Sequence, residues 1–250
     1  MKNTKKNTSK ILAFSWLLMS FGCSSNSSEE NSAKNSLPDT TLTSEAIAPD
    51  VFKLKLDSLG FKTYEVSCKP GDSIPLHYFP ENVFYVTSPG TVEYTMSNGK
   101  KIISEFQKDS VYIRNAGCAI SKNIGNTTVE GILFHIIRPN TMDEAYDNSS
   151  DASVVEASFY KILAESSNIR ATMATYNPGQ ISKKHIHADH ITYVVKGGKF
   201  EVIGSDGVKN AGMLIEGSSN AFSRCEHVFK NTDTTSWKVL MIEVNRKYAK

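Results

Sequence analysis

The feature that most constrains the fold of this chain is an internal repeat. Residues 51–142 superpose on residues 159–250 without a gap, at one constant offset that places His77 on His185. The matched residues are mostly turn formers, with Pro70-Gly71 on Pro178-Gly179, Gly90 on Gly198, Ser97-Asn98-Gly99 on Ser205-Asp206-Gly207, and Asn123 on Asn231. Self-similarity at a fixed offset indicates a duplicated structural unit. We therefore expect two domains of the same fold.

Each copy carries the pattern of β-strands and tight hairpins. Residues 91–96 are followed by Asn98-Gly99, and residues 200–204 by Asp206-Gly207. Both dipeptides favour the positive φ angles of short hairpin turns. The apolar runs near the end of each copy, 131–137 and 237–244, are typical of buried strands. Many short strands with regularly spaced turns predict an all-β sandwich or barrel for each copy.

The first 22 residues have the pattern of a bacterial export signal. A lysine-rich start precedes the apolar run 11–19, which is too short to span a bilayer, and Cys23 follows a small residue. The segment 1–22 resembles a lipoprotein signal peptide, which implies that Cys23 is acylated. The lipid would anchor the mature protein to the cell envelope, facing the periplasm or the outside. An ordinary secretory signal with an incidental Cys23 is the alternative, and both predict export from the cytoplasm.

The segment after the cysteine is expected to be a flexible tether over residues 23–49. It is rich in Ser, Asn, Thr and acidic residues and has few large apolar side chains, so it cannot bury enough surface to fold. The formal net charge of +2 includes the four lysines of the signal segment, so the side chains that follow sum to −2. Since no basic run remains, nucleic acid is not an expected partner.

Four of the six histidines form one pattern in the second copy. His185 and His187 share a face of a predicted strand, because side chains alternate along it. A turn at residues 188–189 brings His190 back towards them, and His227 follows on a later strand. Neutral imidazole suits Fe, Mn, Ni, Cu or Zn. The pattern predicts one divalent transition metal, with these four histidines as its ligands.

The histidines and the repeat together resemble the paired motifs of the cupin superfamily. The run His185-Ile186-His187-Ala188-Asp189-His190 is similar to a motif of small single-barrel cupins, and Gly179, Gly197 and Asn231 stand at framework positions of the family. The resemblance implies an all-β bicupin, in which two tandem jelly-roll (double-stranded β-helix) barrels follow the signal peptide and the tether. The expected ranges are 50–139 for a degenerate N-terminal barrel, 140–157 for a linker and 158–250 for the metal-binding C-terminal barrel.

The two copies differ at the expected ligand positions. In the first copy three of them hold other residues, with Phe79 for His187, Asn82 for His190 and Ala119 for His227, so that only His77 remains. One imidazole does not hold a metal, and we expect the first barrel to be structural or to form a metal-free pocket. In the second copy, the commoner cupin pattern has a glutamate where this chain has His190. Four neutral ligands leave the ion its full charge, which favours an anionic ligand.

Two neighbours of His227 are further candidates. Glu226 is a candidate general base, with a solvated loop residue as the alternative. Cys225 lies two positions before His227 and can share its face of a strand, as an extra ligand or as a buried thiol. Cys68 and Cys118 complete an odd set of three cysteines after Cys23, so at most one internal disulfide is possible.

The resemblance implies a metal-dependent cupin of the cell envelope that acts on a small anionic or hydroxylated molecule, as a dioxygenase-like or isomerase-like enzyme. The competing hypothesis is a non-catalytic lipoprotein that binds a small molecule or a metal. The fold does not choose between them, since cupins host many unrelated activities. A closed four-histidine site would favour binding, and an open position beside a general base would favour catalysis. The first barrel either mediates a homodimer, or the two joined barrels form a pseudo-dimer within one chain.

Overall fold

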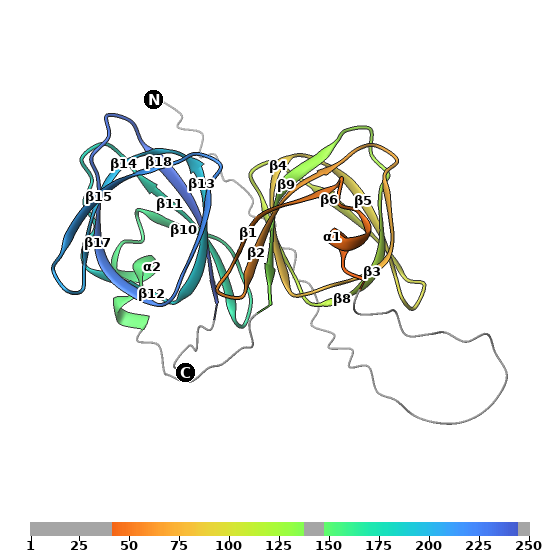
Figure 1. Ribbon diagram of the computed structural model, residues 1–250, viewed down its shortest axis with the longest axis horizontal. Coiled ribbons are helices and arrows are strands. Elements are labelled where there is room, and N and C mark those ends of the chain that lie inside the picture. The colour runs from red at the N-terminus through yellow and green to blue at the C-terminus, as the bar shows by residue number, and fades with distance from the viewer. Residues whose placement is uncertain (1–41, 138–147, 245–250) are drawn as a thin grey trace, which may run out of the picture. The chain divides into compact units, whose positions relative to one another are not determined.

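The computed structural model describes residues 42–137 and 148–244, which form two β-barrels with the same order of strands (Figure 1). Almost all regular structure in these ranges is β-strand, so the predicted all-β class is confirmed. The predicted signal peptide 1–22, Cys23 and most of the predicted tether lie outside the described residues. Within the described ranges, no helix has the length and apolar character needed to cross a membrane.

The first barrel consists of two antiparallel sheets, β1-β2-β9-β4-β7 and β3-β8-β5-β6. A short helix, α1, precedes them and lies against β3 (Figure 1). The bounds are α1 (Ser44–Ile47), β1 (Phe52–Ser58), β2 (Phe61–Cys68), β3 (Ser73–Phe79), β4 (Asn82–Ser88), β5 (Gly90–Met96), β6 (Lys101–Phe106), β7 (Val111–Arg114), β8 (Gly117–Asn123) and β9 (Val129–Ile136).

The second barrel repeats this topology strand for strand. Its sheets are β10-β11-β18-β13-β16 and β12-β17-β14-β15, and helix α2 lies beside β10 and β12. The bounds are η1 (Asn148–Ser150), α2 (Ala152–Val155), β10 (Tyr160–Glu165), β11 (Ile169–Tyr176), β12 (His185–His187), β13 (Asp189–Lys196), β14 (Gly198–Gly204), β15 (Lys209–Leu214), β16 (Ser219–Phe222), β17 (Cys225–Asn231) and β18 (Trp237–Val244). The identical strand order is what a duplication predicts.

The structural repeat starts earlier than the sequence indicates. Thr43 forms a parallel bridge to Tyr78, and Asp151 forms the equivalent bridge to Ile186, at the same offset as the sequence repeat. The helices α1 and α2 follow these bridges at equivalent positions. The first barrel therefore includes residues assigned to the tether before residue 50, and the second includes residues assigned to the linker before residue 158. Helices of four residues are formed by packing rather than by propensity, so they leave little sequence signal.

The predicted hairpin turns are present at the same place in both barrels. Gly99 has a φ of 79° and Gly207 a φ of 77°, in the left-handed region that favours glycine. The residue before each glycine closes the turn, because Asn98 Oδ1 accepts from Lys100 N at 3.0 Å and Asp206 Oδ1 accepts from Val208 N at 2.9 Å. These turns join β5 to β6 and β14 to β15, and they fix the register of each pair.

A buried asparagine holds the end of the barrel together in each copy. Asn123 Nδ2 donates to the carbonyl oxygens of Cys68 at 2.8 Å and Thr127 at 2.9 Å. Asn231 Nδ2 makes the same two bonds, at the same distances, to the equivalent carbonyls of the second barrel. A side-chain amide supplies donors to carbonyls that would otherwise be buried without partners. This role explains why both copies hold asparagine at a position where a smaller polar residue would leave a gap.

The largest cluster of buried apolar side chains contains residues of both barrels. Phe61 and Phe134 from the first barrel and Ile191, Leu240 and Ile242 from the second are each almost fully buried in it. Full burial of such a side chain contributes about 1.5–3 kcal/mol. Because neither barrel completes this cluster alone, experiments on either barrel require the whole chain.

Candidate metal centre

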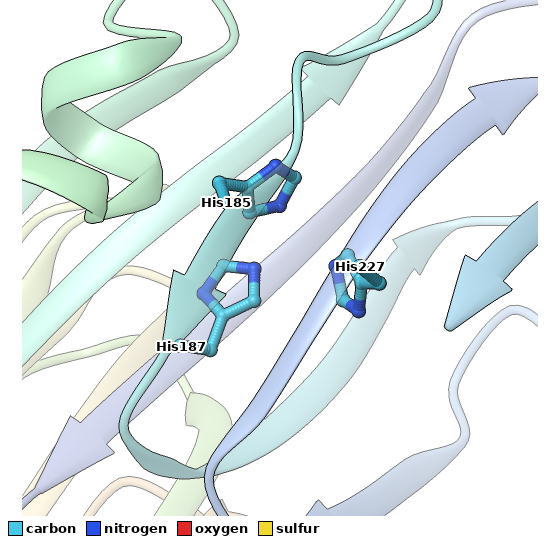
Figure 2. A group of neighbouring side chains, drawn as sticks. All are labelled: His185, His187 and His227. Atoms are coloured by element: carbon cyan, nitrogen blue, oxygen red, sulfur yellow. The ribbon is translucent and has the colours of Figure 1, made fainter. Parts of the chain in front are cut away.

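Three imidazoles, those of His185, His187 and His227, form a triad inside the second barrel (Figure 2). His185 and His187 come from β12, and His227 comes from β17, which pairs with β12 so that His185 lies opposite His227. One nitrogen from each ring belongs to a set whose members all lie within 4.8 Å of one another. The alternation of side chains along a strand places His185 and His187 on one face. The structure therefore brings together three of the four predicted ligands.

Burial favours the neutral form of His185 and of His227. His185 and His187 are almost completely inaccessible to solvent. Desolvation lowers the pKa of His185, and it lowers the pKa of His227 to about 2, with a further contribution from the neighbouring imidazoles. A metal binds the neutral form of histidine, so protons compete little with a metal at His185 and His227.

Hydrogen bonds outside the triad fix the orientation of two rings. His185 Nδ1 lies 2.8 Å from the carbonyl oxygen of Lys183, which only accepts, so Nδ1 carries the proton. His187 Nδ1 lies 3.2 Å from Oε1 of the buried Glu243. The same argument assigns the proton to Nδ1 there and leaves a lone pair on Nε2. Carboxylates and carbonyls behind ligating histidines orient the ring and raise its basicity.

His190 lies beside the triad but outside the set of close nitrogens. It is buried on β13, and its Nδ1 donates to the carbonyl oxygen of Ala188 at 2.7 Å. The centre of its ring is 5.2 Å from that of His187, and the ring of Phe222 stacks on it at 5.1 Å. Desolvation lowers its pKa, as it does for His185 and His227. Its role as a fourth ligand stays a prediction.

Tyr160 is part of the site, and sequence reasoning missed it. Its hydroxyl lies 3.1 Å from His185 Nε2 and 2.9 Å from the hydroxyl of Tyr176. Because Nδ1 of His185 carries the proton, Nε2 accepts from Tyr160. Burial raises the pKa of Tyr160 well above its usual value, so the phenol stays protonated at neutral pH. Tyr160 is thus a buried hydrogen-bond donor at the edge of the triad.

Glu243 is a second residue of the site that the sequence analysis missed, although its place in an apolar run could have indicated a role. It is the one carboxylate in the apolar run 237–244 that forms β18, and its side chain is almost fully buried. Buried carboxylates are rare unless they are paired or bind a cation. Glu243 supplies a negative charge behind His187, on the side of the ring away from its second nitrogen.

Glu226, the predicted general base, lies away from the triad. It alternates out of phase with His227 on β17, and it is paired in the register with Ile186 rather than with a histidine. Its carboxylate forms an ion pair with Lys184 at 2.9 Å near the surface. The structure therefore offers Tyr160 as the proton-bearing group nearest to the triad, with Glu226 on the opposite face of the strand.

Cys225 shares the face of His227, as its spacing predicts. Its Sγ lies 3.8 Å from His227 Nδ1. Burial raises the pKa of the thiol to about 11, so the sulfur is protonated at neutral pH. In the described residues no disulfide joins Cys225, Cys68 and Cys118.

The sequence matches no protein-family model and no curated protein. The structure, in contrast, is similar to solved structures of proteins with little sequence identity. One is Bacillus subtilis oxalate decarboxylase, an enzyme with Mn(II) centres, at 13% identity and a TM-score of 0.55, covering 80% of this chain and 77% of that chain. Another is AerE from Microcystis aeruginosa, at 12% identity and a TM-score of 0.53, covering 77% of this chain and 91% of that chain. Both matches extend over most of this chain, so they include both barrels.

Proposed function

Because the chain has the fold of the duplicated cupins, we propose that its second barrel holds one divalent metal and acts on a small anionic or hydroxylated molecule. The observation that carries this proposal is the triad of His185, His187 and His227, whose ligand nitrogens lie within 4.8 Å of one another. Three protein ligands with further positions left for water or substrate are typical of catalytic metal sites.

The donor set fits a transition metal. Three neutral imidazoles suit Fe, Mn, Ni, Cu and Zn, and they leave the charge of the ion uncompensated by the ligands themselves. Glu243 adds one negative charge behind His187, without a place in the triad. When bound, the metal supplies Lewis acidity and a site for an anionic oxygen. The Mn(II) centres of the structurally similar oxalate decarboxylase support a divalent metal in general.

The residues of the chain supply orientation and a proton donor. Glu243 and the carbonyl of Lys183 accept from Nδ1 of His187 and His185, respectively. Each ring therefore keeps the lone pair on Nε2, the nitrogen farther from its acceptor. Tyr160 and a metal compete for the same lone pair of His185. A hydroxyl displaced from that nitrogen is available to donate to a substrate oxygen beside the triad, and its high pKa keeps the proton in place at neutral pH. These features support a reaction with charge on a substrate oxygen, of a dioxygenase-like or isomerase-like class.

A second candidate function is metal or small-molecule binding without turnover. The position of His190 favours it, because a fourth neutral imidazole lies 5.2 Å, ring centre to ring centre, from His187. If His190 also bound the metal, fewer positions would remain for a substrate. A closed site of four protein ligands is typical of structural rather than catalytic centres.

The place of action is proposed to be the bacterial cell envelope. The support is the sequence pattern before Cys23, which predicts export and acylation. The acyl chains would hold the mature protein at a membrane. The proposed metal chemistry does not depend on this anchor.

Turnover by the metal-loaded protein tests the proposal. The mature chain, with Cys23 replaced by Ser for solubility, would be loaded with each candidate metal and incubated with small dicarboxylates, dicarbonyls and phenols. Oxygen uptake and mass spectrometry would detect products, and the His187→Ala variant is the control. Products that depend on His187 support an enzyme. Tight metal binding with no product from any of these compounds would instead favour the binding function.

A further inference from the structure

The interiors of the two barrels differ in their charged and ionisable side chains. At the offset of the repeat, His135 stands where the second barrel has Glu243, and Arg114 stands where it has Phe222. The second barrel thus places a buried carboxylate near its histidines, whereas the first has a guanidinium in the equivalent region. The two interiors therefore differ in charge at equivalent positions.

The first barrel contains a partly open cavity of about 60 Å³. Most of its wall is apolar, formed by Val66, Phe84, Val92, Phe106 and Leu133, and Arg114 and His135 add polar groups. A single water needs about 10–15 Å³ of such space. The cavity therefore has room for about four to six non-hydrogen atoms.

Arg114 is held at this cavity by groups that do not neutralise it. Its Nε donates to Asn82 Oδ1 at 3.2 Å, and Asn82 is itself fixed by donating to the carbonyl oxygen of Pro80 at 2.8 Å. The guanidinium carbon lies 4.9 Å from the ring centre of Tyr94 and 5.3 Å from that of Phe79. Within residues 42–137 and 148–244, no carboxylate forms an ion pair with Arg114. A planar guanidinium in this setting is suited to a carboxylate.

His135 presents a buried nitrogen without a hydrogen-bond partner among the described residues. Only 1% of its surface is exposed, and its Nε2 has no hydrogen-bond partner among the residues that the structure describes. Its other nitrogen, Nδ1, lies 4.0 Å from Glu45 Oε2. Leaving a buried ring nitrogen without a partner costs its desolvation energy, which a bound ligand would recover.

Glu45 is the carboxylate nearest to these groups, and its contacts lie on the other side of His135. It belongs to α1 and accepts from the hydroxyl of Tyr64 at 2.8 Å. It does not line the cavity, whereas His135 and Arg114 do. No carboxylate of the described residues therefore lines the cavity beside Arg114 and His135.

From this combination we propose that the first barrel binds a small aliphatic monocarboxylate. Its carboxylate is received by Arg114, a polar atom next to it meets His135 Nε2, and its short carbon chain lies against Phe84, Phe106 and Leu133. The cavity volume limits the ligand to the size range of acetate to butyrate, including hydroxylated acids of no more than about six non-hydrogen atoms. This binding is independent of a metal in the second barrel.

Isothermal titration calorimetry with acetate, propionate and butyrate, and with the hydroxylated acids glycolate and lactate, tests the proposal on the whole mature chain. We expect saturable binding by the native protein and none with butylamine, which has a positive charge instead. Arg114→Gln should weaken binding by about tenfold or more, because a hydrogen bond to a charged group is lost. Lys122→Gln, which removes an exposed positive charge from β8 of the same barrel, should leave binding unchanged.

Two further variants keep the test decisive if Arg114→Gln does not fold. Arg114→Lys keeps the charge but loses the planar fork and should bind more weakly than the native protein. His135→Phe should weaken the binding of the hydroxylated acids. A carboxylate could also bind to a metal in the second barrel, and that binding would be lost in the His227→Ala variant. Binding in the first barrel would persist in the same variant. The proposal is overturned if no carboxylate binds at millimolar concentration, or if binding survives in Arg114→Gln and disappears in His227→Ala.

Discussion

Glu243 and His135 occupy equivalent positions on the last strands of their barrels, β18 and β9, and their side chains have different partners. Glu243 lies 3.2 Å from Nδ1 of His187 and orients a ring of the triad. His135, at the matched position of the first barrel, has a ring nitrogen without a hydrogen-bond partner among the described residues. This exchange, together with Arg114 in place of Phe222, distinguishes the first interior, where we propose an anion site, from the second, where we propose a metal site.

The role of Glu243 is testable through metal affinity. Glu243→Gln keeps the shape of the side chain but removes the charge behind His187. We expect the metal affinity to fall by about 10–100-fold, as is usual when a group behind a ligand is changed. Competition with a chelator measures it. Glu226→Gln is the matched control on the outer face of β17, and an equal loss of affinity in both variants would contradict the assignment.

Tyr160 is expected to affect turnover rather than metal binding. Tyr160→Phe removes the hydroxyl that competes for Nε2 of His185, so the metal should remain bound. If the phenol donates a proton or hydrogen bond in the reaction, the rate should fall by about 10²-fold or more. Metal content and product formation, measured on the same preparation, separate the two effects. Loss of the metal from this variant would show that Tyr160 mainly supports the cage.

His135 gives the stability of the protein a predictable dependence on pH. Burial lowers its pKa to about 4 in the folded state, whereas an exposed histidine has a pKa of about 6.5. Between these values the unfolded chain binds a proton that the folded chain does not, so stability falls as the pH drops from about 6.5 to about 4. The slope from this residue is at most about 1.4 kcal/mol per pH unit.

The comparison that isolates this contribution uses the His135→Gln variant. Denaturant unfolding of the metal-free protein at several pH values would give the free energy of unfolding of both proteins. The difference in free energy between native protein and variant should change across this pH window and level off above it. Parallel curves for the two proteins would mean that His135 is not buried in its neutral form.

Sequence reasoning predicts the duplicated barrels because their turns depend on local residue types. The dipeptides Asn98-Gly99 and Asp206-Gly207 demand positive φ angles wherever they occur, and a fixed offset between them reveals the repeat. The pair His185 and His187 is predictable for a similar reason, since alternation along one strand determines their common face.

The missed parts of the site depend on contacts between distant strands. Tyr160 reaches His185 across 25 positions, and Glu243 reaches His187 across 56 positions. An aromatic residue at the start of a strand, as at position 160, gives no sign of such a role. The place of His190 likewise depends on Phe222, which stacks on it from the neighbouring strand β16. Short helices such as α1 carry too few apolar residues to reveal where the barrel begins.

Membrane attachment is expected to depend on Cys23. Replacement of Cys23 with Ser removes the thiol that would be acylated, and with it the hydrophobic anchor. Fractionation of cells that express either form should find the native protein with membranes and the variant in the soluble fraction. Retention of the variant with membranes would contradict lipid attachment at this residue.

Elemental analysis tests the central claim, a metal centre in the second barrel, most directly. The mature chain and its His227→Ala and His77→Ala variants would be purified without a chelator or a histidine tag. His77 is the equivalent of His185 in the first barrel and serves as the control. The account predicts about one metal per chain in the native protein and in His77→Ala, and none in His227→Ala. No metal in the native protein after reconstitution with Fe, Mn, Ni, Cu and Zn, or equal loss from both variants, would contradict it.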